Sequence, residues 1–318
     1  MSVCPVKMNV VIMVWKQQLD AGLGDLLRGT IHLHSLSRQL NFELIVDTQL
    51  HPVSKLLVSN PHKYSDYVVD HQSENIDLTN SPEKLENVIK NKMRRDNPLL
   101  ITTNAYPTEP MQHDCKRFMR NLLMPNDEFK KWFNELRIKF HIPTNYAIAH
   151  FRLGDQELIH DDSNSSESSI DITVYEKLCG MVNFHMERTP NLYIMSDSSM
   201  FKQYLRERIR PELIDRIIPT TPIHLAHPDA AADIEKTKET MFDFMLLINA
   251  RFIKTHSKYT WVSGFVRWAS MIFNVPLFDI KPPKVTMKFQ MGNSTPAVAS
   301  EHTRIIINKP TGFFQKMF

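Results

Sequence analysis

The 318-residue chain has little of what several classes of protein require. Its three cysteines (Cys4, Cys115 and Cys179) lie far apart, so neither a disulfide framework nor a cysteine zinc site is expected, and a reducing compartment is the simpler assignment. No apolar run approaches the length of a membrane span. The net charge of +3 is too small to indicate a nucleic-acid partner.

The N-terminus also lacks the pattern of a signal peptide. The apolar stretch at residues 10–15 is short, and it runs into Lys16 and Asp20 without a small-residue cleavage site. We therefore expect a cytoplasmic protein, with a bacterial or viral source among the alternatives. Glycine is scarce, at 8 residues, so each glycine is expected to have a local purpose.

The length and composition suit two globular domains, because hydrophobic residues make up 42% of the chain and charged residues 23%. Strands alternating with helices predict an α/β fold with parallel sheets covered on both faces. We place one domain at residues 1–141 and a second at 142–280. The basic tail, residues 281–318, either packs back on the first domain or is mobile.

Hydrophobic periodicity assigns the individual elements. The strands are expected at residues 9–15, 42–46, 98–103, 146–152, 192–195, 216–219, 252–255 and 275–278. The helices are expected at residues 26–40, 82–93, 114–124, 127–140, 171–188, 200–208, 234–250 and 261–273. Residues 156–169, rich in Ser, Asp and Glu, are expected to form a surface loop.

A glycine pair, Gly22 and Gly24, lies in the turn after the first predicted strand. The turn invites a nicotinamide-cofactor hypothesis, with Asp47 near the place of a ribose-binding acid. Leu27 stands at the third glycine position and argues against it. A tight turn that a ligand approaches closely is favoured. The neighbouring Asp25 is interpreted either as a helix N-cap or as a catalytic base.

Polar residues gather where three predicted strands end, at one edge of the parallel sheet. Arg152 at a buried strand end is costly unless an anion meets it, so it either binds a diphosphate or pairs with Asp155. Asp197 can accept two donors from a purine or ribose. Thr260 is a plausible N-cap for a helix starting at Trp261, where backbone N–H groups suit a phosphate. No clustered acidic pair for Mg²⁺ is present, so Arg152 would supply the counter-charge.

The same segments resemble the motifs of one enzyme family. Residues 150–155 read HFRLGD and are similar to the His-x-Arg-Arg-x-Asp motif of the α-1,2-, α-1,6- and protein O-fucosyltransferase superfamily. Residues 193–198 read YIMSDS and resemble its second motif. Asp243 and residues 257–261, SKYTW, resemble its third. Residues 22–25, GLGD, stand where the family has Gly-x-Gly-Asn.

The resemblance covers residues 9–278 and implies a GT-B-like fold, in which two Rossmann-like domains with parallel sheets face each other across a cleft. It implies metal-independent, inverting transfer of fucose from GDP-fucose to a glycan or protein hydroxyl, with no cofactor besides the donor. By the family pattern, the catalytic residues are Arg152 and Asp25. The implied donor-binding residues are Gly22, Gly24, His150, Arg152, Asp155, Ser196, Asp197, Asp243, Ser257, Lys258, Tyr259 and Thr260.

Within that pattern, Arg152 binds the β-phosphate, and His150 and Asp197 recognise the nucleoside. The chain departs from the pattern at three positions. Leu153 replaces a second Arg, Asp25 replaces Asn, and Lys258, a candidate compensating charge, replaces a small hydroxyl residue. A catalytically degenerate protein that binds sugar nucleotides or glycans on the same fold is therefore the alternative.

Two histidine pairs, His32 with His34 and His224 with His227, suggest metal ligands. Neither pair has a matching third ligand at a recognisable spacing, so no metal site is predicted.

Overall fold

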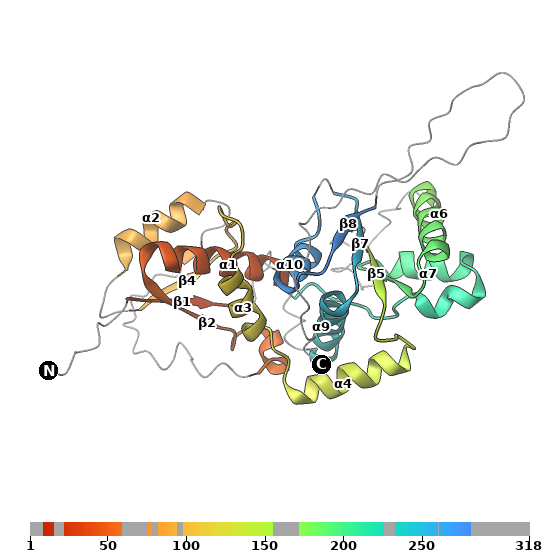
Figure 1. Cartoon of the computed structure of the whole chain (residues 1–318), viewed down its shortest axis with the longest axis horizontal. Helices are drawn as coiled ribbons and strands as arrows, with labels where there is room; N and C mark the ends of the chain where they lie inside the picture. Colours follow the sequence, from red (N-terminus) through yellow and green to blue (C-terminus); the bar gives the residue numbers. More distant parts are fainter. Residues whose placement is uncertain are drawn as a thin grey trace, which may run out of the picture.

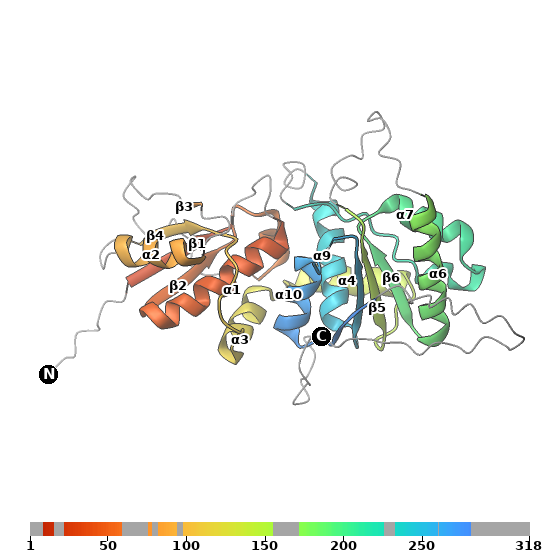
Figure 2. The same cartoon turned by 90° about the horizontal axis from the view of Figure 1, so that it is seen from above.

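The computed structural model describes residues 9–15, 22–58, 76–77, 82–93, 98–154, 172–225, 233–259 and 261–280. These residues form two α/β units, each built on a four-stranded sheet whose strand pairs all run parallel. Figures 1 and 2 show the units side by side, with α1 and α10 at their junction. The predicted fold class of two parallel α/β units is confirmed.

The N-terminal sheet has the strand order β2-β1-β4-β3. Its strands are β1 (Asn9–Val14), β2 (Phe42–Asp47), β3 (Ile76–Asp77) and β4 (Leu99–Thr102). Its helices are α1 (Leu23–Leu40), α2 (Pro82–Lys92) and α3 (His113–Leu122), with a 3-10 helix η1 at Pro52–Leu56. The apolar residues of β1 from Val11 to Val14 are all buried, as expected for a parallel strand covered on both faces.

The C-terminal sheet has the order β6-β5-β7-β8. Its strands are β5 (Ala147–Arg152), β6 (Leu192–Ser196), β7 (Ile253–Ser257) and β8 (Leu277–Asp279). Its helices are α4 (Asp127–Lys139), α6 (Ile172–Arg188), α7 (Ser199–Arg208), α9 (Ile234–Asn249) and α10 (Gly264–Phe273), with a 3-10 helix η3 at Pro211–Arg216. The carboxyl ends of β5, β6 and β7 meet at one edge, as predicted.

One hydrophobic cluster runs through both units. It contains Val11 and Leu27 from the first unit and Phe242 and Val266 from the second. Helix α4 precedes the expected boundary near residue 141, yet it packs on the second unit (Figure 1), where Phe133 lies 5.2 Å from Phe242, centroid to centroid. The two units are therefore joined by buried apolar surface as well as by the chain.

Three element predictions are corrected. Helix α1 begins at Leu23, so Asp25 lies in its first turn and Gly22 is the N-cap. Helix α10 begins at Gly264 with Ser263 as N-cap, so the helix expected from Trp261 starts three residues later.

The third correction concerns the strand predicted at residues 216–219. Residues Pro211–Arg216 form η3, and only Ile217 makes a bridge, to Ile194. Pro219 has no N–H to donate to a ladder, so the apolar pair at 217–218 cannot extend into a strand.

Several predictions lie outside the described residues: those on Asp155, Thr260 and His227, the loop at 156–169 and the tail at 281–318. Among the helices that the structure describes, none is long and apolar enough to cross a membrane.

Candidate functional site

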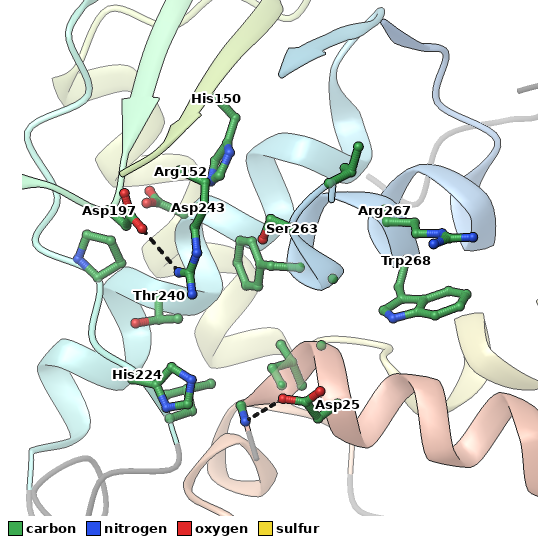
Figure 3. Close-up of a pocket in the computed structure, with 18 of the residues that line it drawn as sticks. Asp25, His150, Arg152, Asp197, His224, Thr240, Asp243, Ser263, Arg267 and Trp268 are labelled. Carbon is green, nitrogen blue, oxygen red and sulfur yellow. Dashed lines mark hydrogen bonds and ion pairs between the residues drawn. The ribbon is translucent and has the colours of Figure 1, made fainter. Parts of the chain in front are cut away.

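A cavity of about 280 Å³ opens between the two units (Figure 3). Its walls come from the ends of β5 and β6, the start of α1, residues 222–225, one face of α9 and the start of α10. Eight of the predicted site residues line it: Gly22, Gly24, Asp25, His150, Arg152, Ser196, Asp197 and Asp243. Segments more than 200 residues apart in the chain thus meet at one place.

Arg152, the last residue of β5, is held by Asp197 just beyond the end of β6 (Figure 3). Nη1 of Arg152 lies 3.2 Å from Oδ2 of Asp197, and the two side chains are 19% and 5% exposed. The same carboxylate accepts hydrogen bonds from the backbone N–H groups of Leu153 (2.8 Å) and Gly154 (3.3 Å). Asp197 therefore makes contacts within the protein through both oxygens, where the sequence predicted contacts with a nucleoside.

Ser196 is also engaged within the protein. Its hydroxyl donates to the carbonyl of Phe151 (2.9 Å) and accepts from the N–H of Ser198 (3.1 Å). Ser198 in turn caps α7 by accepting from the N–H of Phe201 (3.0 Å). These bonds tie the ends of β5 and β6 together and hold Asp197 at a fixed place between them.

His150 is buried two residues before Arg152. Burial, with a smaller contribution from the Arg152 charge, lowers the pKa of His150 to about 3, so the imidazole is neutral at pH 7. Its Nδ1 atom has no hydrogen-bond partner among the residues that the structure describes. Because an unsatisfied buried polar atom is costly, this nitrogen is a candidate ligand contact.

Asp243 on α9 is a further buried ionisable group at the cavity (Figure 3). Burial raises its pKa to about 7, against the opposing effects of the Lys202 charge and a 2.8 Å hydrogen bond from the Thr220 hydroxyl. Lys202 is buried as well, and its ammonium donates to the Thr220 carbonyl. Thr220 thus links the two buried groups, Asp243 through its hydroxyl and Lys202 through its carbonyl.

Two helices begin at the cavity. At the start of α1, the Asp25 carboxylate accepts from the N–H of Gly22, whereas Ser263, at the start of α10, makes no side-chain capping bond to the described residues. The helices abut, because a Cβ atom at Gly24 would lie 2.9 Å from the carbonyl carbon of Gly264. The backbone N–H groups and the dipole of α10 thus favour an anion here, as does Arg152.

Asp25 faces the same space from the first turn of α1, and both of its oxygens are engaged. Oδ1 lies 3.0 Å from Nη2 of Arg28, and Oδ2 accepts from the N–H of Gly22 at 3.2 Å. The Arg28 guanidinium also lies 4.0 Å from the ring centre of Tyr106, and its Nε donates to the carbonyl of Asn104. Asp25 is therefore a fixed, ion-paired carboxylate rather than an N-cap.

Three described residues of the predicted site, Ser257, Lys258 and Tyr259, are not among those that line the cavity. The Ser257 hydroxyl accepts from the N–H of Tyr259 (3.2 Å), and the N–H of Lys258 donates to the carbonyl of Arg152 (3.0 Å). The Lys258 ammonium lies against Gly154, where an added Cβ would be 2.1 Å from Nζ. These residues border the end of β5 beside the cavity.

Several other residues that line the cavity were not predicted from the sequence. They include Arg28, Tyr106, His224, Thr240, Arg267 and Trp268. Arg28 follows Asp25 by three residues, and because α1 begins at Leu23 this spacing brings the two side chains together as an ion pair. His224 was noted only as a possible metal ligand. In the part of the chain that the structure describes, no group of three or more His, Cys, Asp or Glu side chains suits a metal ion.

No protein-family model and no curated protein sequence matches the chain. Among solved structures, NodZ α-1,6-fucosyltransferase soaked with GDP-fucose is similar over 85% of this chain and 94% of that one, with 11% identity and a TM-score of 0.49. The selenomethionine form of fucosyltransferase NodZ from Bradyrhizobium is similar over 86% of this chain and 95% of that one, with 11% identity and a TM-score of 0.49. A mutant of FUT1 from Arabidopsis thaliana in complex with GDP is similar over 89% of this chain and 72% of that one, with 10% identity and a TM-score of 0.47. The NodZ structures are named as fucosyltransferases.

Proposed function

We propose that the protein is a glycosyltransferase, with GDP-fucose as donor and a glycan or protein hydroxyl as acceptor. One observation carries the proposal. A guanidinium fixed by a carboxylate, that of Arg152 on Asp197, lines an inter-domain cavity where helix α10 begins without a side-chain cap among the described residues. A cation and a helix N-terminus together suit the charge of a diphosphate. The order and spacing of the motifs favour GDP-fucose among nucleotide sugars.

The proposed reaction is an inverting displacement without a metal ion. An acceptor oxygen attacks the anomeric carbon from the face opposite GDP, and the bond from that carbon to the β-phosphate oxygen breaks with its electron pair. Arg152 and the first turn of α10 stabilise the charge that develops on the departing phosphate. Because Asp197 already fixes Arg152, little reorganisation is needed as the charge forms.

The remaining residues have supporting roles in this proposal. The neutral His150 imidazole offers its Nδ1 atom to the nucleotide. Lys258, beside the end of β5, supplies the positive charge that a second Arg would carry at the position of Leu153. Asp25, fixed by Arg28, accepts a hydrogen bond from the acceptor hydroxyl and orients it.

Release of GDP from GDP-fucose tests the proposal, with GDP-mannose and a UDP-sugar as competing donors. We expect turnover of GDP-fucose by the wild-type protein and a loss of at least about 100-fold in Arg152→Ala. Arg188→Ala is a matched control, because Arg188 is exposed on α6, outside the cavity, and stacks on Phe184. Full activity in Arg152→Ala would rule out the assigned role of this residue.

A binding protein without transferase activity is the second candidate. Leu153 is buried where the family has a second Arg, and both Asp25 oxygens are engaged within the protein. Tight GDP-fucose binding without GDP release, in the presence of a range of glycan and peptide acceptors, would favour this candidate over the enzyme.

A further inference from the structure

The proposed reaction needs a proton acceptor. The attacking hydroxyl must lose a proton, and Asp25 is the carboxylate on the acceptor side. Its Oδ1 is paired with Arg28 at 3.0 Å and its Oδ2 accepts from Gly22 at 3.2 Å. Both oxygens are thus occupied by contacts within the protein, so a second side chain is needed to take the proton.

His224 lines the same cavity and lies next to the Gly22 turn. A Cβ atom added to Gly22 would lie 2.9 Å from Nε2 of His224, so the imidazole edge approaches the start of α1 closely. Figure 3 shows the ring on the Asp25 side of the cavity, with Arg152 extending toward that side from β5. The imidazole thus lies across from the proposed site of the departing phosphate.

The residues just before His224 in the chain are anchored to α9. The N–H and hydroxyl of Thr221 both donate to Oε2 of Glu239, at 2.7 and 2.9 Å. The N–H of Ile223 donates to the hydroxyl of Thr240 at 3.0 Å. These bonds hold the backbone immediately before His224 in place, so the ring is presented to the cavity from a fixed support.

We propose that His224 is the general base of the transfer, an inference that rests on the proposed function. Nε2 of the neutral imidazole takes the proton of the acceptor hydroxyl as its oxygen bonds to the anomeric carbon. The bond from that carbon to the β-phosphate oxygen breaks, GDP leaves with the electron pair, and the imidazolium later returns its proton to water. Histidine suits this step because its ordinary pKa of about 6.5 lies near neutral pH.

The test compares wild type with His224→Gln and His224→Ala in GDP release from GDP-fucose, with water as acceptor. Gln retains a polar nitrogen but cannot take a proton. We expect kcat to fall by about 100-fold or more in both variants, with unchanged KM for the donor and an unchanged rise in melting temperature with GDP. Added imidazole is expected to restore part of the activity of His224→Ala in proportion to its concentration. His113→Gln, an exposed histidine at the start of α3, is the matched control.

The outcomes separate this inference from the proposed function. If wild type releases GDP but His224→Gln retains activity within about threefold, His224 is not the base and the transferase proposal stands. A loss of GDP binding equal to the loss of kcat, or no response to imidazole, also overturns the inference, because the role is then structural. No GDP release by wild type from any nucleotide sugar overturns both.

Discussion

The carboxylate of Asp197 holds the guanidinium of Arg152 at the point where β5 and β6 end, with Oδ2 3.2 Å from Nη1. The two oxygens of this carboxylate accept hydrogen bonds from the backbone N–H groups of Leu153 and Gly154, so one side chain fixes both the cation and the backbone that follows it. A partly buried cation kept in place by protein contacts is oriented before a ligand arrives. Such preorganisation is what electrostatic stabilisation of a departing phosphate requires.

Replacing Asp197 is expected to cost stability as well as activity. Asp197→Ala leaves Arg152 and two backbone N–H groups without their partner, which costs about 3 kcal/mol of unfolding free energy. Asp197→Asn is expected to cost less, because an amide oxygen can still accept from Leu153. Urea unfolding of the two variants measures the difference. Equal stability of Asp197→Ala and wild type would show that the ion pair is not formed.

The contact between the starts of α1 and α10 depends on Gly24. A Cβ there meets backbone atoms of Gly264 and Phe265 at 2.9 Å, so Gly24→Ala forces the helices apart and is expected to destabilise the protein by about 1–3 kcal/mol. Gly180 on α6 is the matched control, since an added Cβ there meets no atom within 4 Å. Gly180→Ala is expected to stabilise the protein by about 0.5–1 kcal/mol. Thermal unfolding compares the two, and a stabilising Gly24→Ala would contradict the close packing of the helices.

The buried His150 predicts a loss of stability in acid. Its pKa is lowered from 6.5 to about 3, so the neutral ring stabilises the folded state at and above pH 6.5. As the pH falls from 6.5 toward 3, the unfolded chain binds a proton that the folded protein does not. The contribution to unfolding free energy is then lost at about 1.4 kcal/mol per pH unit.

The measurement is urea unfolding of wild type and His150→Gln at pH 6.5 and pH 4.5. The glutamine variant lacks this titration, so wild type is expected to lose about 2 kcal/mol more than the variant over the two pH units. Parallel pH dependence in the two proteins would show that His150 is accessible to protons in the folded state.

Asp243 predicts the opposite dependence. Its pKa is raised from 3.8 to about 7, so the protonated carboxyl contributes stability that is fully present below pH 3.8 and is lost as the pH rises through about 7. Asp243→Asn retains an oxygen for the Thr220 hydroxyl and does not titrate. We expect wild type to become less stable relative to this variant between pH 4 and pH 7, by up to about 1.4 kcal/mol per unit. A constant difference across that range would contradict the raised pKa.

Most of the fold could be predicted from the sequence because its signals are local. Strand β1 contains the continuous apolar run at residues 10–14, β5 opens with the apolar residues 147–149, and the helix at Asp127–Lys139 shows helical spacing of Phe129 and Phe133. The start of α10 was predicted wrongly because Thr260 and Ser263 are both favoured N-cap residues. Local sequence does not decide between them, and the structure begins the helix after Ser263.

The site was predictable only in part for a related reason. Parallel strands bring their carboxyl ends to one edge, so Arg152 and Asp197 could be placed together without coordinates. The pairing that uses both oxygens of Asp197 could not be foreseen, since it depends on how the chain turns at Leu153 and Gly154. His224 lies in an irregular connection, and it reaches the cavity through the packing of one unit against the other.

A thermal-shift panel of GDP, GDP-fucose, GDP-mannose, UDP-sugars and NAD, measured on wild type and Arg152→Ala, tests the nucleotide site most directly. We predict that GDP and GDP-sugars raise the melting temperature of wild type selectively, by an increment that grows with ligand concentration and is absent in Arg152→Ala. Stabilisation by NAD or UDP-sugars instead, or an equal rise with GDP in both proteins, would contradict a guanosine-diphosphate site at Arg152.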